Sequence, residues 1–357
     1  MAWTLTDFGA LDANQRKAWS DVRDSNPALD SPYFHPAFAG AVHAMFGDVQ
    51  VAVNDGHVWF PMQVHKRRAR PVGWPGADFQ GPVAAPGVLV DPLELVRTNG
   101  LRALTFDHIS EARTDFAPWV DGYLEAPFMD VTGGLDGYVG RISKASRDKL
   151  SRVRRMTNKA TRQLGEVRFV WDARDPRLLD WLIDTKRDQY AATGAYDFFA
   201  MRRRRDLVHH LARTRVDGFA GVLSAVYAGD TLLAAHFGLR DGPVLHWWFP
   251  VFDRSYAELA PGWILLRELI SAAPQLGLAR IDLGPGDEDY KRRAMTGVVS
   301  VAQGEVTAAP WRRKLRVARI AAQRTAIARL KDSPLKPKLS AMRATGYRAL
   351  AAREARR

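Results

Sequence analysis

The chain of 357 residues contains no cysteine. Disulfide bonds, thiolate nucleophiles and cysteine-ligated metal sites are therefore excluded, and no metal is expected. No apolar run is long enough to span a bilayer, and the N-terminus lacks the basic-then-apolar order of a signal peptide. The hydrophobic content of 46% and charged content of 25% are typical of a globular protein, and the length suggests two domains. We therefore expect a cytoplasmic protein.

Most of the chain also lacks net charge. Residues 311–357 carry 15 Lys and Arg against 2 Asp and Glu, whereas residues 1–310 carry 37 of each sign. The formal net charge of +13 thus belongs to the C-terminal segment and does not indicate nucleic-acid binding by the rest. Helix-forming residues predict a basic helical tail over 311–331, with a second helix at 338–352. Two interpretations stay open: contact with an anionic membrane at its inner face, or packing on the body.

The clearest structural signals lie between residues 222 and 294. Gly229-Asp230 separates two apolar runs and predicts a hairpin, and Asp241-Gly242-Pro243 predicts a second turn. Pro261-Gly262 opens a segment that is apolar on nearly every face, as expected of a buried helix. The predicted elements are strands at 222–228, 231–239, 244–249 and 279–283, with helices at 263–273 and 286–293.

The rest of the chain predicts a mixed α/β protein. Residues 1–30 have the pattern of a helical lead-in, and Pro71–Gly87 forms an irregular loop rich in Gly and Pro. Further predicted strands cover 49–54, 57–63, 101–109 and 167–171, and further predicted helices cover 33–46, 146–164, 178–193 and 204–213. We place domain boundaries so that residues 1–135 and 136–310 form two α/β domains and residues 311–357 form the tail.

Several segments resemble one branch of a known superfamily. The sequence is similar to the CelD branch of the GNAT acyltransferases, which is associated with cellulose and exopolysaccharide synthesis and related to the FemABX transferases. The segments that carry the resemblance are Ser-Pro-Tyr-Phe-His-Pro-Ala-Phe (31–38), Ala-Pro-Phe-Met-Asp-Val (126–131), Arg-Asp-Lys-Leu-Ser-Arg-Val-Arg-Arg (147–155), Leu-Ala-Pro-Gly-Trp-Ile-Leu-Leu (259–266), Arg-Ile-Asp-Leu-Gly (280–284) and Gly-Asp-Glu-Asp-Tyr-Lys (286–291).

This resemblance implies two GNAT-like domains side by side and an acyl-CoA donor, with acetyl-CoA the first candidate. The implied reaction transfers the acyl group directly to an amine or hydroxyl of a sugar or glycan precursor in exopolysaccharide or envelope polysaccharide synthesis. The segment Pro261-Gly262-Trp263-Ile264 is the expected pyrophosphate site, with the backbone N–H groups of Gly262–Ile264 as donors, because helix N-termini bind anions. The sequence departs from the family pattern here, since Ile264 stands where a small residue is usual.

The candidate catalytic residues lie on the predicted strand at 244–249 and in the motif at 286–291. The imidazole of His246 suits a general base, and a hydrogen-bonded histidine inside the sheet is the alternative. The resemblance assigns the motif residues to the family signature, and a structural role stays open for each of them. These residues are Asp287, Tyr290 and Lys291.

Three further residues are candidates for binding the acceptor. Trp248 and Tyr196 offer aromatic rings that stack on sugar faces, although core packing is the alternative. Asp282 is acidic inside a strand, where a carboxylate usually meets a specific partner. That partner is either the substrate or an arginine.

Two arginine-rich segments leave other functions open. Arg202–Arg205 is either a solvated helix start or a phosphate patch, and residues 66–70 resemble half of an arginine motif found in cyclic-di-GMP receptors. One alternative function is therefore a non-catalytic sensor of that nucleotide. The other is a FemABX-like aminoacyl transferase that uses aminoacyl-tRNA.

Overall fold

The computed structural model describes residues 3–286 and 288–330, except for the side chains of 323–330. Its strands are β1 Trp3–Asp7, β2 Val49–Asn54, β3 Val58–His65, β4 Arg68–Arg70, β5 Ala103–Ser110, β6 Val120–Asp130, β7 Val167–Val170, β8 Arg215–Val216, β9 Phe219–Ala228, β10 Thr231–Asp241, β11 Val244–Phe252, β12 Arg280–Asp282 and β13 Gly297–Val306. Its α-helices are α1 Ala13–Asp24, α2 Pro36–Phe46, α3 Pro92–Thr98, α4 Gly134–Arg141, α5 Lys144–Leu164, α6 Pro176–Thr193, α7 Arg202–Arg213, α8 Pro261–Ala272, α9 Asp289–Ala294 and α10 Pro310–Leu330.

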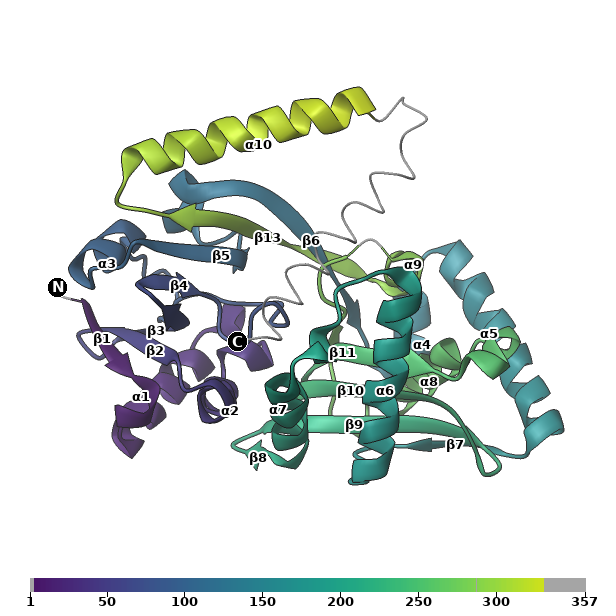
Figure 1. Ribbon diagram of the computed structural model, residues 1–357. Coiled ribbons are helices and arrows are strands. Elements are labelled where there is room, and N and C mark those ends of the chain that lie inside the picture. Colours follow the sequence, from purple (N-terminus) through teal and green to yellow (C-terminus); the bar gives the residue numbers. More distant parts are fainter. Residues whose placement is uncertain (1–2, 287, 331–357) are drawn as a thin grey trace.

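All of these strands belong to one sheet, in the order β1-β2-β3-β4-β5-β13-β6-β12-β11-β10-β9-β7, with β8 attached to β9 (Figure 1). At its centre β13 pairs antiparallel with both β5 and β6, although it comes last in the sequence. The end of β6, residues 128–130, then pairs with β12. The sheet therefore runs without a break from the N-terminal half of the chain into the C-terminal half.

The first residues of the chain differ from the sequence prediction. Residues 1–30 were expected to be a helical lead-in, but Trp3–Asp7 forms β1, an edge strand paired antiparallel with β2. The helical pattern is confirmed only from Ala13, where Asp12 and Gln15 form a capping box. Short edge strands carry little local signal, because their pairing partner lies far away in the sequence.

The C-terminal half follows its predicted element order. The hairpin of β9 and β10 turns at Gly229-Asp230, β11 follows, and α8 connects β11 to the parallel strand β12. Apolar residues of α6 and α7 cover one face of β9–β11, and those of α4, α5 and α8 cover the other. Both faces are buried, which explains why these strands read as nearly continuous apolar runs.

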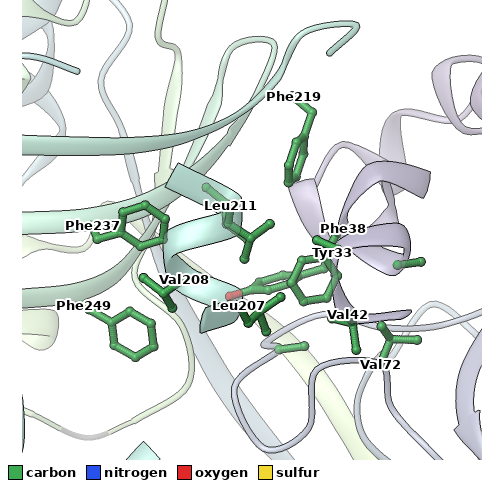
Figure 2. Packing of buried hydrophobic residues seen from close by; sticks show 14 of the residues in the cluster. Tyr33, Phe38, Val42, Val72, Leu207, Val208, Leu211, Phe219, Phe237 and Phe249 are labelled. Carbon is green, nitrogen blue, oxygen red and sulfur yellow. The ribbon is translucent and has the colours of Figure 1, made fainter. Parts of the chain in front are cut away.

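A single apolar cluster joins the two halves beside the sheet (Figure 2). Phe38 and Val42 of α2, which is apolar along most of its length, meet Leu207 and Leu211 on the apolar face of α7 in this cluster. Further aromatic residues of the cluster are Tyr33, Phe219, Phe237 and Phe249. The halves are therefore packed through a common core as well as through the sheet.

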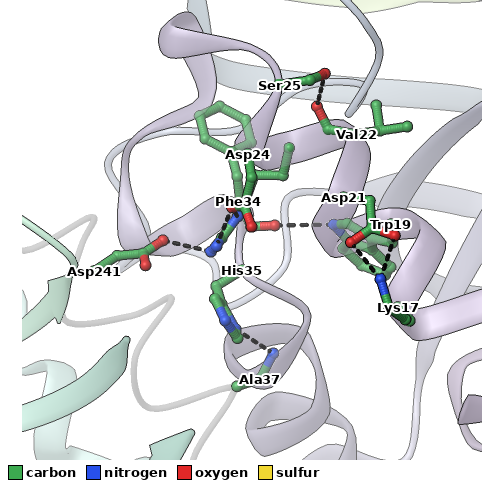
Figure 3. Close-up of polar contacts among 11 residues, drawn as sticks. Lys17, Trp19, Asp21, Val22, Asp24, Ser25, Phe34, His35, Ala37 and Asp241 are labelled. Carbon is green, nitrogen blue, oxygen red and sulfur yellow. Dashed lines mark hydrogen bonds and ion pairs between the residues drawn. The ribbon is translucent and has the colours of Figure 1, made fainter. Parts of the chain in front are cut away.

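Two ion pairs reinforce this joint. Arg23 at the end of α1 donates from Nη1 to Asp241 at the end of β10, 2.5 Å away and buried (Figure 3). Arg280 of β12 holds Asp30 through both terminal nitrogens, at 2.6 and 2.7 Å. Each pair connects the N-terminal segment to a strand of the other half, so α1 and the turn after it are fixed against the C-terminal half.

Helix α10 begins the basic tail and lies along β6 and β13 (Figure 1). Arg313 and Arg316 both contact the buried carboxylate of Asp121 on β6. The helix predicted at 311–331 is thus present, whereas the one predicted at 338–352 lies outside the described residues. None of the described helices combines the length and the apolar character needed to cross a bilayer.

Candidate active site

A cavity of about 690 Å³ opens where the parallel strands β11 and β12 separate. Their ladder ends at the pair His246 and Asp282, yet β11 continues to Phe252 and so leaves a gap beside it. Helices α6, α8 and α9 enclose this gap. The lining includes Asp78, Lys186, Tyr190, Trp247, Trp248, Arg254, Pro261, Gly262, Trp263, Glu288, Tyr290 and Lys291. A pocket of this volume accommodates a small-molecule ligand.

The N-terminus of α8 forms one end of the cavity, as the sequence predicted. Ala260 precedes the helix in the left-handed conformation, at φ 54°, and its carbonyl accepts the N–H groups of Trp263 and Ile264 at 3.0 and 3.2 Å. Pro261 has no N–H, so Gly262 keeps the one N–H in this turn that has no acceptor among the described residues. Ile264 itself is fully buried. The predicted four-residue anion site thus offers one free donor.

Asp78 and His246 form a pair in the cavity wall. Oδ2 of Asp78 lies 2.9 Å from Nε2 of His246, a contact that has the distance of an ion pair without the alignment of a hydrogen bond. His246 is fully buried behind Asp78, and only Asp78 reaches the cavity. Asp78 comes from the irregular loop at 71–87, so the pair draws one member from each half of the chain.

The surroundings of Asp78 favour its charged form. Burial raises the pKa of this carboxyl, but His246, His108 and Lys291 outweigh burial and lower its pKa below the ordinary value. Gly284 makes the close packing possible, because a Cβ there would come 2.3 Å from Oδ2 of Asp78 and its φ is +70°. The loop after β12 is therefore shaped around a carboxylate.

Lys186 of α6 brings a second titratable group into the cavity. Its Nζ donates to the carbonyl of Pro250 at 3.1 Å and lies 5.5 Å from the ring centre of Tyr190. Burial, opposed by the charge of Glu288 and aided by that of Lys291, lowers the pKa of Lys186 to about 8. A lysine with this pKa is partly neutral at physiological pH, so it can accept as well as donate a proton.

Tyr290 and Lys291 line the cavity together, on α9. Burial raises the pKa of Tyr290, so its hydroxyl stays protonated and can donate a hydrogen bond. Lys291 is buried, with Nζ 2.9 Å from the carbonyl of Pro285, 3.3 Å from that of Gly284 and 3.2 Å from a carboxylate oxygen of Glu288. Lys291 thus holds the loop before α9 in place while facing the cavity.

Two other predicted site residues, Asp282 and Tyr196, are not part of the cavity lining. Asp282 is buried against the guanidinium of Arg280, at 2.8 and 3.2 Å, which agrees with the structural alternative and leaves it no free face toward a substrate. Tyr196 accepts a hydrogen bond from Arg204 beside the aromatic cluster. Asp287 lies outside the described residues.

Trp248 and its neighbour on β11 point to opposite faces, as strand geometry requires. Trp248 borders the cavity and packs against Tyr33 and Phe198, with ring centroids 5.9 Å apart in both cases. Trp247 stacks on His236 in the opposite core, with ring centroids 3.8 Å apart, and also borders the cavity. Trp248 is therefore placed to contact a bound ligand from the side of the N-terminal half.

Sequence reasoning missed Asp78 and Lys186. Asp78 lies in a loop whose irregularity hides its position, and the Gly-Pro-rich context of 71–87 is the only signal in the sequence that marks it. Lys186 is an ordinary residue of a predicted helix, and its burial depends on the later strand β11. Both residues can be recognised as site residues only in the folded structure, where distant segments of the chain meet.

Comparison with known proteins finds one family whose model matches part of the chain. Residues 147–292 match the family described as acetyltransferase (GNAT) domain, and this range contains most of the cavity lining. Among curated proteins no relative matches. Among the described residues, no group of His, Asp and Glu side chains is arranged to hold a metal.

Solved structures share the fold across most of the chain. L-PGS from Bacillus licheniformis has 10% identity and a TM-score of 0.52, covering 87% of this chain and 97% of that chain. FemX has 8% identity and a TM-score of 0.52, covering 85% and 96%. A protein of unknown function from Bacteroides thetaiotaomicron has 11% identity and a TM-score of 0.54, covering 85% and 99%.

These likenesses extend over both halves, so the fold is shared beyond the matched domain. At such low identities they concern architecture alone. The predicted mixed α/β, GNAT-like architecture is confirmed. Residues 147–292 carry an acetyltransferase (GNAT) domain, which supports an acyltransferase enzyme.

Proposed function

We propose that the protein transfers an acyl group, with acetyl as the first candidate, from acyl-CoA to an amine or hydroxyl of a sugar or glycan precursor. The observation that carries this proposal is the cavity inside the GNAT domain, with the Asp78–His246 pair in its wall and the α8 N-terminus at its end. The assignment to the CelD branch and to exopolysaccharide synthesis depends only on the sequence segments that resemble that branch.

The proposed reaction is a direct transfer. The acceptor's nitrogen or oxygen attacks the thioester carbonyl, the carbon–sulfur bond breaks, and CoA leaves as the thiolate. Asp78, charged and backed by His246, takes the proton that the acceptor loses. Lys186 and Tyr290 are placed to supply hydrogen bonds to the reacting oxygen and sulfur atoms. No cysteine exists to carry the acyl group in between.

The donor would lie along β11 with its diphosphate near α8. The free N–H of Gly262 and the positive end of the α8 dipole favour an anion there, and Arg254 is among the other lining residues of the cavity. A single N–H holds a diphosphate less firmly than a full turn of donors, so we expect weak donor binding, in the range of about 10–100 µM.

A second candidate function is aminoacyl transfer from aminoacyl-tRNA. It is favoured by the shared fold of FemX and L-PGS, which extends over both halves of this chain. The cavity chemistry is the same in this case, because an ester carbonyl replaces the thioester. The two candidates differ in the donor alone, so donor binding separates them.

The test is calorimetric titration of the full chain with acetyl-CoA and, separately, with charged tRNA. Gly262→Glu places a carboxylate at the free N–H, whereas Gly262→Ala is the matched control, since a Cβ there meets nothing closer than 3.9 Å. We expect the Glu variant to weaken acetyl-CoA binding at least about tenfold and the Ala variant to bind normally. Binding of charged tRNA without binding of acetyl-CoA would select the second candidate. Binding of neither would reject both.

A further inference from the structure

Two arginine-rich segments that lie far apart in the sequence meet at a second cavity, of about 900 Å³. Strand β4 contributes Arg68 and Arg70, and the start of α7 contributes Arg202–Arg205. The remaining lining includes His65, Trp74, Phe198, Gln63 and Asp48. We call this cavity the arginine groove. It lies between the N-terminal and C-terminal halves, on the other side of Phe198 from the candidate active site.

The arginine groove carries a large excess of positive charge. Asp48 is the one carboxylate among its lining residues, against six arginines. Arg68 is paired with Glu305 at 3.0 Å, and Arg202 is 3.7 Å from Asp206. The side chains of Arg203 and Arg205 have no acidic partner within the described part of the chain. Confining like charges costs free energy unless an anion neutralises them.

Arg70 points to the same conclusion from its own surroundings. Its guanidinium lies 5.3 Å from the ring centre of Trp74, which fixes the orientation of both planar groups. Its Nε is buried and has no hydrogen-bond acceptor among the described residues. A buried donor without an acceptor is costly, so a ligand atom that accepts from it would be strongly favoured.

The α7 helix adds a third contribution. Its N-cap, Met201, supplies no side-chain acceptor, and the helix begins at Arg202, at the groove. The N-terminal N–H groups and the helix dipole both favour negative charge at this position. Unlike a bare helix N-terminus, this one is surrounded by guanidinium groups that bind phosphate oxygens in pairs.

We propose that the arginine groove binds a small ligand that carries two or more phosphates, such as a nucleotide. Its volume is that of a small-molecule site, and the rings of Trp74 and Phe198 offer apolar faces beside the phosphate-binding groups. Cyclic-di-GMP is one member of this class. This inference goes beyond the acyl-transfer proposal and does not depend on it.

The arginine groove and the candidate active site share one wall. Phe198 lines the groove, Trp248 lines the active-site cavity, and their ring centroids are 5.9 Å apart. Gly76 lies against both rings, where a Cβ would come 2.6 Å from Phe198 and 3.2 Å from Trp248. Displacement of Phe198 by a ligand in the groove would therefore press on Trp248 in the wall of the active-site cavity.

The test is calorimetric titration of the full chain with inorganic pyrophosphate and, separately, with cyclic-di-GMP. Arg203→Glu combined with Arg205→Glu reverses two charges in the groove. The matched control is Arg154→Glu combined with Arg155→Glu, which makes the same charge change on the exposed face of α5. We expect the groove variant to raise the Kd for pyrophosphate at least about tenfold and the control to change it less than about twofold.

Several outcomes would overturn the proposal. One is no saturable binding of either probe to the wild-type chain, and another is equal weakening in the groove and α5 variants, which would indicate diffuse charge attraction. Binding of an RNA hairpin without binding of pyrophosphate or cyclic-di-GMP would assign the groove to a macromolecule instead. If the double variant does not fold, Arg203→Ala alters one exposed side chain and serves in its place, with a smaller expected rise of about threefold.

Discussion

Asp78 and His246 come from opposite halves of the chain, and their side chains meet at 2.9 Å in the wall of the candidate active site. Neither half contains the pair by itself. The carboxylate that faces the cavity belongs to the N-terminal half, although the matched domain covers residues 147–292. The N-terminal half is thus part of the site as well as a support for it.

Asp78→Asn tests the proposed proton acceptor. The amide keeps the shape of the side chain but cannot take a proton, so we expect transferase activity to fall by about a hundredfold or more, with the melting temperature within a few degrees of wild type. Asp55→Asn is the control, because Asp55 lies in an exposed turn at φ 48°, where asparagine is tolerated. Full activity in Asp78→Asn would remove this carboxylate from the mechanism.

Lys291→Met tests whether this lysine supports the fold. The variant removes the donors to Gly284 and Pro285 and leaves Glu288 unpaired, so we expect the free energy of unfolding to fall by about 1–3 kcal/mol. Arg292→Met changes an exposed neighbour, for which we expect about 0.5 kcal/mol or less. Urea denaturation measures both. Equal stability of the two variants would assign Lys291 to the ligand alone.

The buried His35 leads us to expect that the folded protein loses stability in acid. It caps α2 by accepting the N–H of Ala37 at Nδ1 and stacks on Phe219, as Figure 3 shows for the cap. Burial lowers its pKa to about 4, and the nearby charge of Arg23 contributes. Between pH 6.5 and 4 the unfolded chain binds a proton that the folded chain does not, so stability falls as the pH falls.

We expect this histidine to account for a loss on the order of 3 kcal/mol across that pH range. His35→Asn keeps a capping acceptor without the titration, so its unfolding free energy should fall less steeply than that of wild type. Urea denaturation of both chains at several pH values gives the difference. Parallel curves for the two chains would show that His35 does not titrate in this range.

The tail supplies the fourth prediction, which concerns a membrane surface. Trp311 and Leu315 on α10 are 62% and 63% exposed, beside Arg312 and Lys314, which form no ion pair within the described residues. Apolar and basic side chains together are typical of segments that bind anionic bilayers. We propose that residues 311–357 hold the protein there, and expect sedimentation with anionic vesicles at low salt that high salt abolishes.

Deleting residues 311–357 should remove this binding and leave a folded body. The deletion also removes the partners Arg313 and Arg316 from Asp121, so Asp121→Asn in the deleted chain is the control for stability. The membrane role would be rejected if vesicle binding survives the deletion or if the full chain never binds vesicles. Helix α10 would then serve only to pack on the sheet.

Local patterns predicted the C-terminal half well, for physical reasons. The turn at Gly229-Asp230, the apolar strands and the buried helix after Pro261 each depend on neighbours in the sequence. Position in space was harder to predict. Gly262 was correctly placed at a helix start, but the sequence does not show that Ala260 would take up the N–H groups of Trp263 and Ile264.

The features that sequence reasoning did not reach are all non-local. Asp78 acquires its role from His246, and the arginines of β4 and α7 form a groove only when the halves pack together. The same holds for β13, whose insertion between β5 and β6 has no signature in its own residues. The sequence shows which side chains are present in each case, but which residues contact them depends on the whole fold.

The position of β13 in the sequence also determines when the sheet can be completed during synthesis on the ribosome. Residues up to 130 emerge with β5 and β6 already made, but the strand that fills the slot between them is synthesised only at Gly297–Val306. Until then two strand edges are exposed to other nascent chains, which is a hazard for aggregation. The N-terminal part of the sheet therefore stays open until β13 has been synthesised. Until then the edges of β5 and β6 need protection from aggregation.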